Sequence, residues 1–180
     1  MNYHKIEKTS IANGVGVRCV LWVSGCSLRC KGCHNPQTWA FDSGNLFDDA
    51  AKQEFFEALD KSYIKGCTFS GGHPLEYENL PYVYVLVKEC KERFPEKDIW
   101  LYTGYTLSMS DFDTSADICC DKSLLTSRIL AMCDVVVDGP YVEELRDITL
   151  AYRGSKNQRL IDVKQSIKQN EIVLYEPRKE

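Results

Sequence analysis

The sequence predicts an α/β fold built on a parallel sheet that is either open or curled toward a barrel. Short apolar segments that suit strands alternate four times with longer segments that have helical periodicity. This alternation is typical of right-handed βαβ units, which place parallel strands side by side. A chain of 180 residues with 44% hydrophobic residues fits one domain with a core of its own.

Each predicted strand is a short apolar segment that stops at a turn signal. The first, 17–23 (VRCVLWV), is rich in β-branched and aromatic residues, which suits a strand buried on both faces, and Ser24-Gly25 ends it. Later strands stop at similar signals, such as a Gly-Gly or a Gly-Pro pair. The predicted strands are 17–23, 66–70, 98–103 and 134–137.

The predicted helices lie between these strands. In 47–61, apolar side chains recur at helical spacing, and carboxylates at the start suit the helix dipole. In 80–94, Pro81 lies in the first turn and Pro95 lies beyond the end. The predicted helices are 47–61, 80–94 and 123–132, and the tail carries two further strand candidates, 160–163 and 172–175.

Composition and charge argue against nucleic acid and membrane partners. The 22 Lys and Arg residues are scattered among 26 Asp and Glu residues, so no positive stripe faces a phosphate backbone. The longest apolar runs, such as 20–23, are far too short to cross a bilayer, and the polar N-terminal segment does not read as a secretory signal. We therefore expect a cytoplasmic protein.

Nine cysteines point to metal or catalytic chemistry for some of them. The number is odd, and disulfide frameworks are rare under the reducing conditions of the cytoplasm. Cys19 and Cys67 fall in strand patterns and Cys90 in a helix pattern, so a buried structural role is favoured for these three. Cys119, Cys120 and Cys133 are left undecided between structural and chemical roles.

The loop after the first strand carries the main chemical signal. Cys26, Cys30 and Cys33 lie within eight residues at C-x₃-C-x₂-C spacing, flanked by glycines. Structural zinc sites and most electron-transfer iron–sulfur clusters take four protein ligands, whereas this loop offers three thiols. Three thiolates on a four-iron cluster leave one iron open for a small molecule. A fourth ligand from the adjacent His34 is the strained alternative.

Several segments together resemble the activating proteins of anaerobic (class III) ribonucleotide reductase, within the radical S-adenosylmethionine superfamily. The cysteine loop carries the resemblance to the superfamily, and Gly32, just before the third cysteine, matches the narrower family. The other matching segments are FSGGHPL (69–75), LYTGY (101–105), VDGPY (137–141) and YRGSKNQR (152–159).

The resemblance implies a set of ligands and cofactor contacts. Cys26, Cys30 and Cys33 would bind a [4Fe–4S] cluster, and S-adenosylmethionine would bind the open iron. The remaining residues that it places at the cofactor are Gly32, His34, Gly71, Gly72, His73, Thr103, Asp138, Arg153 and Asn157, with Cys33 itself also beside it. For Arg153 and Asn157, recognition of the partner protein is the alternative role. His73 departs from the family pattern, in which an acidic residue commonly follows the glycine pair.

The resemblance also implies fold, activity and partners. We expect a partial (β/α) barrel with a curved, mostly parallel sheet in one domain over 1–180, with a core of about 14–163 and an unassigned tail over 164–180. Reductive cleavage of S-adenosylmethionine would generate a glycyl radical on the catalytic subunit of the reductase, with flavodoxin or ferredoxin as electron donor. The alternatives are an activase of another glycyl radical enzyme, such as pyruvate formate-lyase, and a non-catalytic electron carrier.

Overall fold

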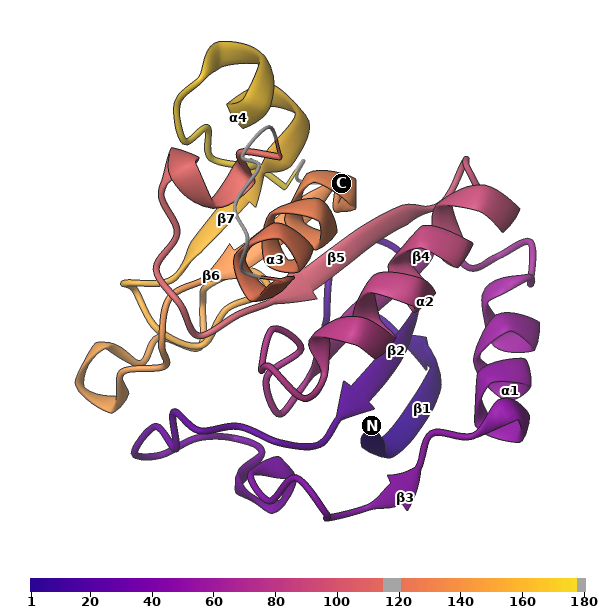
Figure 1. Cartoon of the computed structure of the whole chain (residues 1–180). Coiled ribbons are helices and arrows are strands. Elements are labelled where there is room, and N and C mark those ends of the chain that lie inside the picture. Colours follow the sequence, from indigo (N-terminus) through magenta and orange to yellow (C-terminus); the bar gives the residue numbers. More distant parts are fainter. Residues whose placement is uncertain (115–120, 178–180) are drawn as a thin grey trace.

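The computed structural model describes residues 1–114 and 121–177, and one mixed sheet dominates this part of the chain (Figure 1). The strand order is β3-β1-β2-β4-β5-β6-β7. The strands are β1 (Asn2–Ser10), β2 (Arg18–Val23), β3 (Asn45–Leu46), β4 (Gly66–Gly71), β5 (Asp98–Tyr102), β6 (Val135–Asp138) and β7 (Arg159–Asp162). The α-helices are α1 (Asp49–Leu59), α2 (Leu80–Arg93), α3 (Asp121–Met132) and α4 (Val163–Gln169), with 3-10 turns η1 (Pro36–Thr38), η2 (Met109–Phe112) and η3 (Glu143–Leu145).

The centre of the sheet is the predicted parallel unit. Strands β2, β4, β5 and β6 pair in parallel, and they correspond to the four predicted strands. The three predicted helices correspond to α1, α2 and α3, so the α/β class is confirmed. The flanking strands β1, β3 and β7 pair antiparallel, which makes the whole sheet mixed, and the described pairings leave it open between β3 and β7.

Strand β1 is the largest element that has no counterpart among the predictions. Its sequence, NYHKIEKTS, is polar and most of its residues are only partly buried, so it lacks an apolar pattern. Backbone pairing with β2 on one side and β3 on the other holds it in the sheet. The short strand β3 and helix α4 were also not predicted. Of the two tail candidates, 160–163 overlaps β7, whereas 172–175 makes a single bridge, Ile161 with Leu174.

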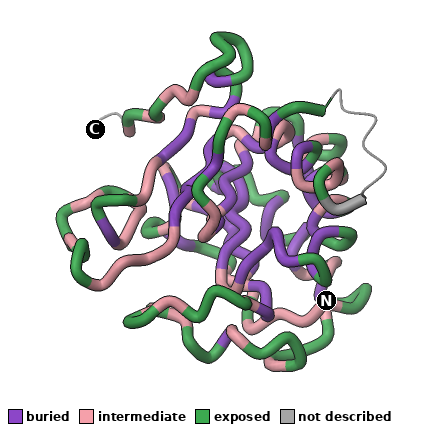
Figure 2. Tube along the Cα trace, turned by 60° about the vertical axis from the view of Figure 1, so that its left-hand side comes forward, coloured by how far each residue is buried: buried purple, intermediate pink, exposed green. Residues whose placement is uncertain are grey.

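The two faces of the sheet have different covers. Helices α1, α2 and α3 contribute to one large core on the face that carries Cys19, Phe69 and Leu101. A smaller cluster on the other face contains Trp100 and Val137 and is covered by aromatic side chains of the C-terminal part of the chain. The central strands are buried on both faces, as predicted, while loops and turns form most of the exposed surface (Figure 2).

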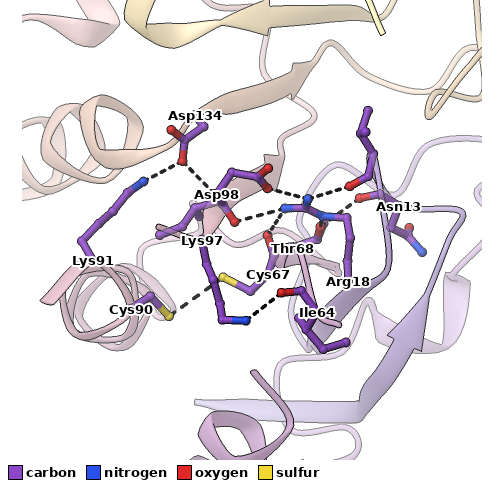
Figure 3. A network of polar contacts seen from close by, with 12 residues as sticks. Asn13, Arg18, Ile64, Cys67, Thr68, Cys90, Lys91, Lys97, Asp98 and Asp134 are labelled. Carbon is purple, nitrogen blue, oxygen red and sulfur yellow. Dashed lines mark hydrogen bonds and ion pairs between the residues drawn. The ribbon is translucent and has the colours of Figure 1, made fainter. Parts of the chain in front are cut away.

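At the N-terminal ends of the parallel strands, a buried arginine links β2, β4 and β5 (Figure 3). The Arg18 side chain is fully buried and forms an ion pair of 2.5 Å with Asp98. Its Nε donates to Thr68 Oγ1 at 2.8 Å, and its Nη2 donates to the Cys67 carbonyl at 2.7 Å. Every arm of the guanidinium therefore has a partner, which is what a buried charge requires.

Four of the cysteines outside the loop belong to the core. Cys19, Cys67, Cys90 and Cys133 are each at most 2% exposed, so the structural role predicted for the first three is confirmed. Burial raises the pKa of the Cys19 thiol to about 12, which keeps it protonated and unreactive at neutral pH. Cys119 and Cys120 lie outside the described residues.

Within the described ranges, no helix has the length and apolar character needed to span a bilayer.

Candidate functional site

The cysteine loop starts where β2 ends and is held from both sides by backbone hydrogen bonds. Gly25 adopts a positive φ of 91°, which a side chain would make strained, and turns the chain out of the strand. The Gly25 and Cys26 amides donate to the Thr38 and Trp39 carbonyls at 2.8 and 3.0 Å. The returning segment around η1 therefore fixes the base of the loop next to the end of the sheet.

The three loop cysteines are free thiols of intermediate exposure. Burial raises the pKa of Cys26, which favours the protonated thiol until a metal displaces the proton. Among the described residues, no three His, Cys, Asp or Glu side chains are grouped so as to hold a single metal ion. A four-iron cluster makes a different demand, because each thiolate binds its own iron and the sulfurs need not converge on one point. The donor set thus fits a cluster with one iron left open.

A pocket of about 460 Å³ opens beside this loop at the C-terminal ends of the parallel strands. Residues after β2, β4, β5 and β6 contribute to its wall, as expected for a site in a parallel α/β sheet. The structure brings the following predicted residues together in this wall: Cys26, Cys30, Cys33, His34, Gly71, Gly72, His73, Thr103 and Arg153. Gly32, Asp138 and Asn157 are not part of it.

The glycine pair after β4 allows two loops to approach closely. Gly71 has a φ of 105°, and the Gly72 amide donates to the Val23 carbonyl at 2.7 Å. A Cβ atom on Gly72 would lie 2.5 Å from the Gly25 carbonyl oxygen, a distance that real side chains do not tolerate. The pair therefore presents bare backbone to the pocket beside the cysteine loop.

His73 lies on the pocket wall with an incomplete set of hydrogen bonds. Its side chain is nearly fully buried, its Nε2 lies 2.8 Å from Thr103 Oγ1, and its ring packs edge-on against Tyr105. Its Nδ1 lies 3.5 Å from Glu76 Oε1, which is too long for a good hydrogen bond, and Nδ1 has no other partner within the described residues. His73 Nδ1 therefore faces Glu76 across a long, weak contact and makes no strong hydrogen bond.

Glu76 binds the cysteine loop without lining the pocket, and no motif in the sequence points to it. Its buried carboxylate accepts hydrogen bonds from the amide and the hydroxyl of Ser27, inside the cysteine loop, at 2.8 and 2.6 Å. The contact with His73 and these Ser27 bonds lower the pKa of Glu76 to about 2, against the opposing effect of burial. Its spacing of three residues from His73 was the only available signal in the sequence.

Arg153 also carries an unmet hydrogen-bonding group at the pocket. Its Nη1 donates to the Gln158 carbonyl at 3.1 Å, but its Nε is buried and has no partner within the described residues. The preceding Tyr152 has a φ of 58°, an uncommon conformation for a residue with a side chain, and its carbonyl accepts from the Tyr102 hydroxyl at 2.7 Å. The guanidinium is thus held at the wall with capacity to bind an anion.

The three predicted residues outside the wall have other positions. Asp138 is fully buried, forms an ion pair with Arg159 and accepts from the Leu107 amide at 2.9 Å. Asn157 is exposed and donates to the Pro140 carbonyl at 2.7 Å. Gly32 is exposed in the cysteine loop, with a φ of 74°, and faces Glu143 so closely that a Cβ would lie 2.0 Å from the carboxylate oxygen.

The pocket has the donor atoms for a cluster and a small polar ligand. Its lining includes the three cysteines of the loop, the bare backbone of the glycine pair, and the side chains of His73 and Arg153. Together with the parallel strands at the centre of the sheet, this set fits an iron–sulfur protein. In agreement, residues 12–161 match the family model described as a 4Fe-4S single cluster domain.

Curated relatives narrow the class further. The chain is 40% identical over 160 residues to the anaerobic ribonucleoside-triphosphate reductase-activating protein of Haemophilus influenzae, covering 88% of this chain and 96% of the relative. It is 38% identical to the protein of that name in Escherichia coli K12, with the same coverage, and 41% identical to that of bacteriophage T4, covering 89% and 93%. The chain belongs to the family of anaerobic ribonucleoside-triphosphate reductase-activating proteins.

Proposed function

We propose that the chain activates anaerobic ribonucleoside-triphosphate reductase by generating a glycyl radical on its catalytic subunit, with a [4Fe–4S] cluster and S-adenosylmethionine as cofactors. The observation that carries the proposal is the loop of three free, half-buried thiols beside a pocket of about 460 Å³. Relatives that cover 88% of the chain are named as activating proteins of this reductase.

The cluster would be held by Cys26, Cys30 and Cys33, one thiolate on each of three irons. When bound, it supplies the electron for the reductive cleavage of S-adenosylmethionine. The protein contributes the positions of the reacting groups and the exclusion of water. The close contact of Gly72 with Gly25 serves this purpose, because it fixes the loop that carries Cys26 against the end of β4.

Four groups on the wall suit a zwitterionic nucleoside ligand. Backbone at Gly71 and Gly72 can meet its amino acid end, and the Arg153 guanidinium is suited to its carboxylate. Thr103 and the buried His73 supply polar atoms deeper in the wall. His34, whose ring packs against Tyr141, and Gly32 would then flank the cofactor on the loop side.

Asp138 and Asn157 do not line the pocket, so an indirect role suits them better than direct contact with the cofactor. Asp138 binds Arg159 and the Leu107 amide, and the Asn157 side chain binds the Pro140 carbonyl. We propose that both act on the cofactor through the loops that they fix, with Asn157 also exposed to a partner protein.

The proposal also covers the location, the domain organisation and the electron donor of the protein. The chain acts in the cytoplasm as one domain over 1–180, whose sheet curves as a partial barrel around the pocket. Flavodoxin or ferredoxin delivers the electron, and no nucleic acid takes part. The low number of scattered basic residues, 22 against 26 acidic ones, supports the last point.

Electron paramagnetic resonance tests the activity directly. Anaerobically reconstituted protein, a reductant, S-adenosylmethionine and the anaerobic reductase should together give a glycyl doublet and release 5′-deoxyadenosine. Release of 5′-deoxyadenosine without a doublet would reject this partner and favour another glycyl radical enzyme. If neither 5′-deoxyadenosine nor the doublet formed, the result would favour a non-catalytic electron carrier.

Two cysteine substitutions, one at a proposed cluster ligand and one in the core, test the ligand assignment. Cys30→Ala should lose the brown absorbance of the cluster and the cleavage of S-adenosylmethionine together, because one thiolate is gone. Cys133→Ala removes a thiol that is buried at the end of α3, away from the pocket wall, and should retain both properties.

A further inference from the structure

A chain of polar contacts crosses the ends of three parallel strands and ends in the cysteine loop. The Tyr105 amide donates to Thr103 Oγ1 at 3.1 Å, after β5, and this oxygen lies 2.8 Å from His73 Nε2, after β4. His73 Nδ1 faces Glu76 Oε1 at 3.5 Å. The same oxygen accepts both hydrogen bonds from Ser27, which follows β2 and Cys26.

Glu76 is the point where this chain enters the loop. Ser27 itself is exposed, whereas the carboxylate that binds it is 6% exposed. A buried carboxylate is costly unless it is hydrogen-bonded, so Glu76 favours the loop conformation in which Ser27 presents both its amide and its hydroxyl. That conformation places the adjacent Cys26 at the pocket wall.

The Cys26 amide is also held, by the Trp39 carbonyl at 3.0 Å, but Ser27 makes no such backbone bond among the described residues. The Asn79 side chain binds the Ser24 carbonyl at 2.8 Å, and the His73 amide binds the Gly25 carbonyl at 2.7 Å, so both act at the base of the loop. Ser27 lies beyond that base, between the first two cysteines. The Glu76 carboxylate therefore controls a part of the loop that the basal contacts do not reach.

We propose that Glu76 is a positioning residue, which fixes Ser27 and with it Cys26, and which couples the cysteine loop through His73 and Thr103 to the pocket wall. The effect on cofactor binding rests on the proposed function, whereas the effect on the loop does not. Glu76 touches neither cluster nor cofactor in this arrangement. Its removal lets the loop move relative to His73 while the fold persists.

The first test uses the protein without a cluster, so its result is independent of the activity. Hydrogen exchange of the Ser27 amide is compared, by nuclear magnetic resonance, in the unmodified chain and in Glu76→Ala, Glu76→Gln and Glu78→Gln. Because the Ser27 amide donates to the carboxylate, Glu76→Ala should speed its exchange about tenfold or more. Glu76→Gln keeps an acceptor oxygen and should give an intermediate rate. Glu78 is exposed, so Glu78→Gln should leave the rate unchanged.

The second test measures cofactor use after anaerobic reconstitution. Glu76→Ala should raise the KM for S-adenosylmethionine about tenfold and change kcat much less, since the loop carrying the cluster is displaced relative to the wall. Glu76→Gln should recover part of the loss. A double variant, Ser27→Ala with Glu76→Gln, should be little worse than Glu76→Gln alone, because both residues act through one contact.

Two results would overturn the proposal. One is a Ser27 exchange rate that Glu76→Ala leaves unchanged; the other is a faster rate with an unaltered KM in both Glu76 variants. If Glu76→Ala does not fold, the near-isosteric Glu76→Gln carries both measurements. If the unmodified protein does not cleave S-adenosylmethionine, the proposed function fails, yet the exchange experiment still decides whether Glu76 fixes the loop.

Discussion

The two ends of the parallel strands carry polar networks of opposite character. At the N-terminal ends, the buried Arg18 guanidinium is bound by Asp98, Thr68 and backbone carbonyls (Figure 3). At the C-terminal ends, His73 Nδ1 and Arg153 Nε are buried without a hydrogen-bond partner within the described residues. Because leaving a buried polar group unpaired costs free energy, the second arrangement stabilises the fold less than the first.

This contrast separates stability from function along a single sheet. Arg18 is fully bound and has no remaining donor for a ligand, so its network can only stabilise the fold. At the pocket, His73 and Arg153 each leave one nitrogen without a hydrogen bond, so these residues contribute less to the stability of the fold. Variants at the two ends should therefore affect different measurements, and each of the following predictions tests that separation.

The largest effect is expected for Arg18→Ala. It leaves Asp98 without its buried partner and opens a space beneath Trp100, whose ring lies 5.3 Å from the Arg18 guanidinium carbon. The free energy of unfolding should fall by about 3–5 kcal/mol, as measured by urea denaturation of the cluster-free protein. Arg93→Ala, at a half-exposed arginine of α2, is the matched control and should cost less than about 1 kcal/mol. A comparable loss in both variants would refute the special role of the buried network.

Asp134→Asn should give the next largest effect, with a defined pH dependence. Asp134 lies just before β6 and accepts from Lys91 (Figure 3). It also accepts from Lys164 and from the Ile99 amide. Burial opposes ionisation, but the two lysines and the amide prevail and lower its pKa below the ordinary value of 3.8. The substitution should cost about 2 kcal/mol at pH 7, because a charged acceptor is lost.

The sign of the pH effect follows from the lowered pKa. A carboxylate with a lower pKa in the folded state stabilises the fold fully above the unfolded value and loses this effect as pH falls toward the folded value. The difference between the unmodified chain and Asp134→Asn should stay constant from pH 7 to about 5 and shrink below about 4. Urea denaturation at these pH values measures it. A difference that grows on acidification would contradict the assignment.

Arg153→Ala should show the reverse division of effects at the pocket end. The unmet Nε contributes little to the fold, so the thermal midpoint of the cluster-free protein should change little. The affinity of the reconstituted protein for S-adenosylmethionine should fall about tenfold, since a charged hydrogen bond to the ligand is lost. Arg153→Lys keeps the charge but not the planar fork and should recover only part of the affinity. A marked loss of stability with unchanged affinity would place Arg153 with the structural residues.

Sequence patterns sufficed where one segment contains the whole signal. The apolar run 17–23 predicts β2, and the spacing of the three cysteines predicts one loop that carries them beside a pocket, because both depend on neighbours in the chain. Strand β1 escaped prediction because backbone pairing, not apolar side chains, keeps it in the sheet. Backbone pairing with another segment leaves no periodic pattern in the sequence of the strand itself.

The partners of some residues near the site could not be predicted because they are far apart in the sequence. Glu76 reaches the cysteine loop only because β2 and β4 are neighbours, since Glu76 and Ser27 are 49 positions apart in the sequence. The buried Asp138 is likewise matched by Arg159, on the neighbouring antiparallel strand β7. Neither partner can be identified before the strand order is known.

The smallest effect is expected for Lys31→Ala. Lys31 lies in the cysteine loop and forms an ion pair of 3.6 Å with Glu144, but the side chains are 85% and 70% exposed. Water screens such a pair, so the thermal midpoint should stay within about 1 °C and the iron content after reconstitution should not change. If iron were lost, exposed charge and not the buried Glu76 contact would hold the loop. The contrast between the fully paired Arg18 network and the pocket would then have to include exposed ion pairs of the cysteine loop as well.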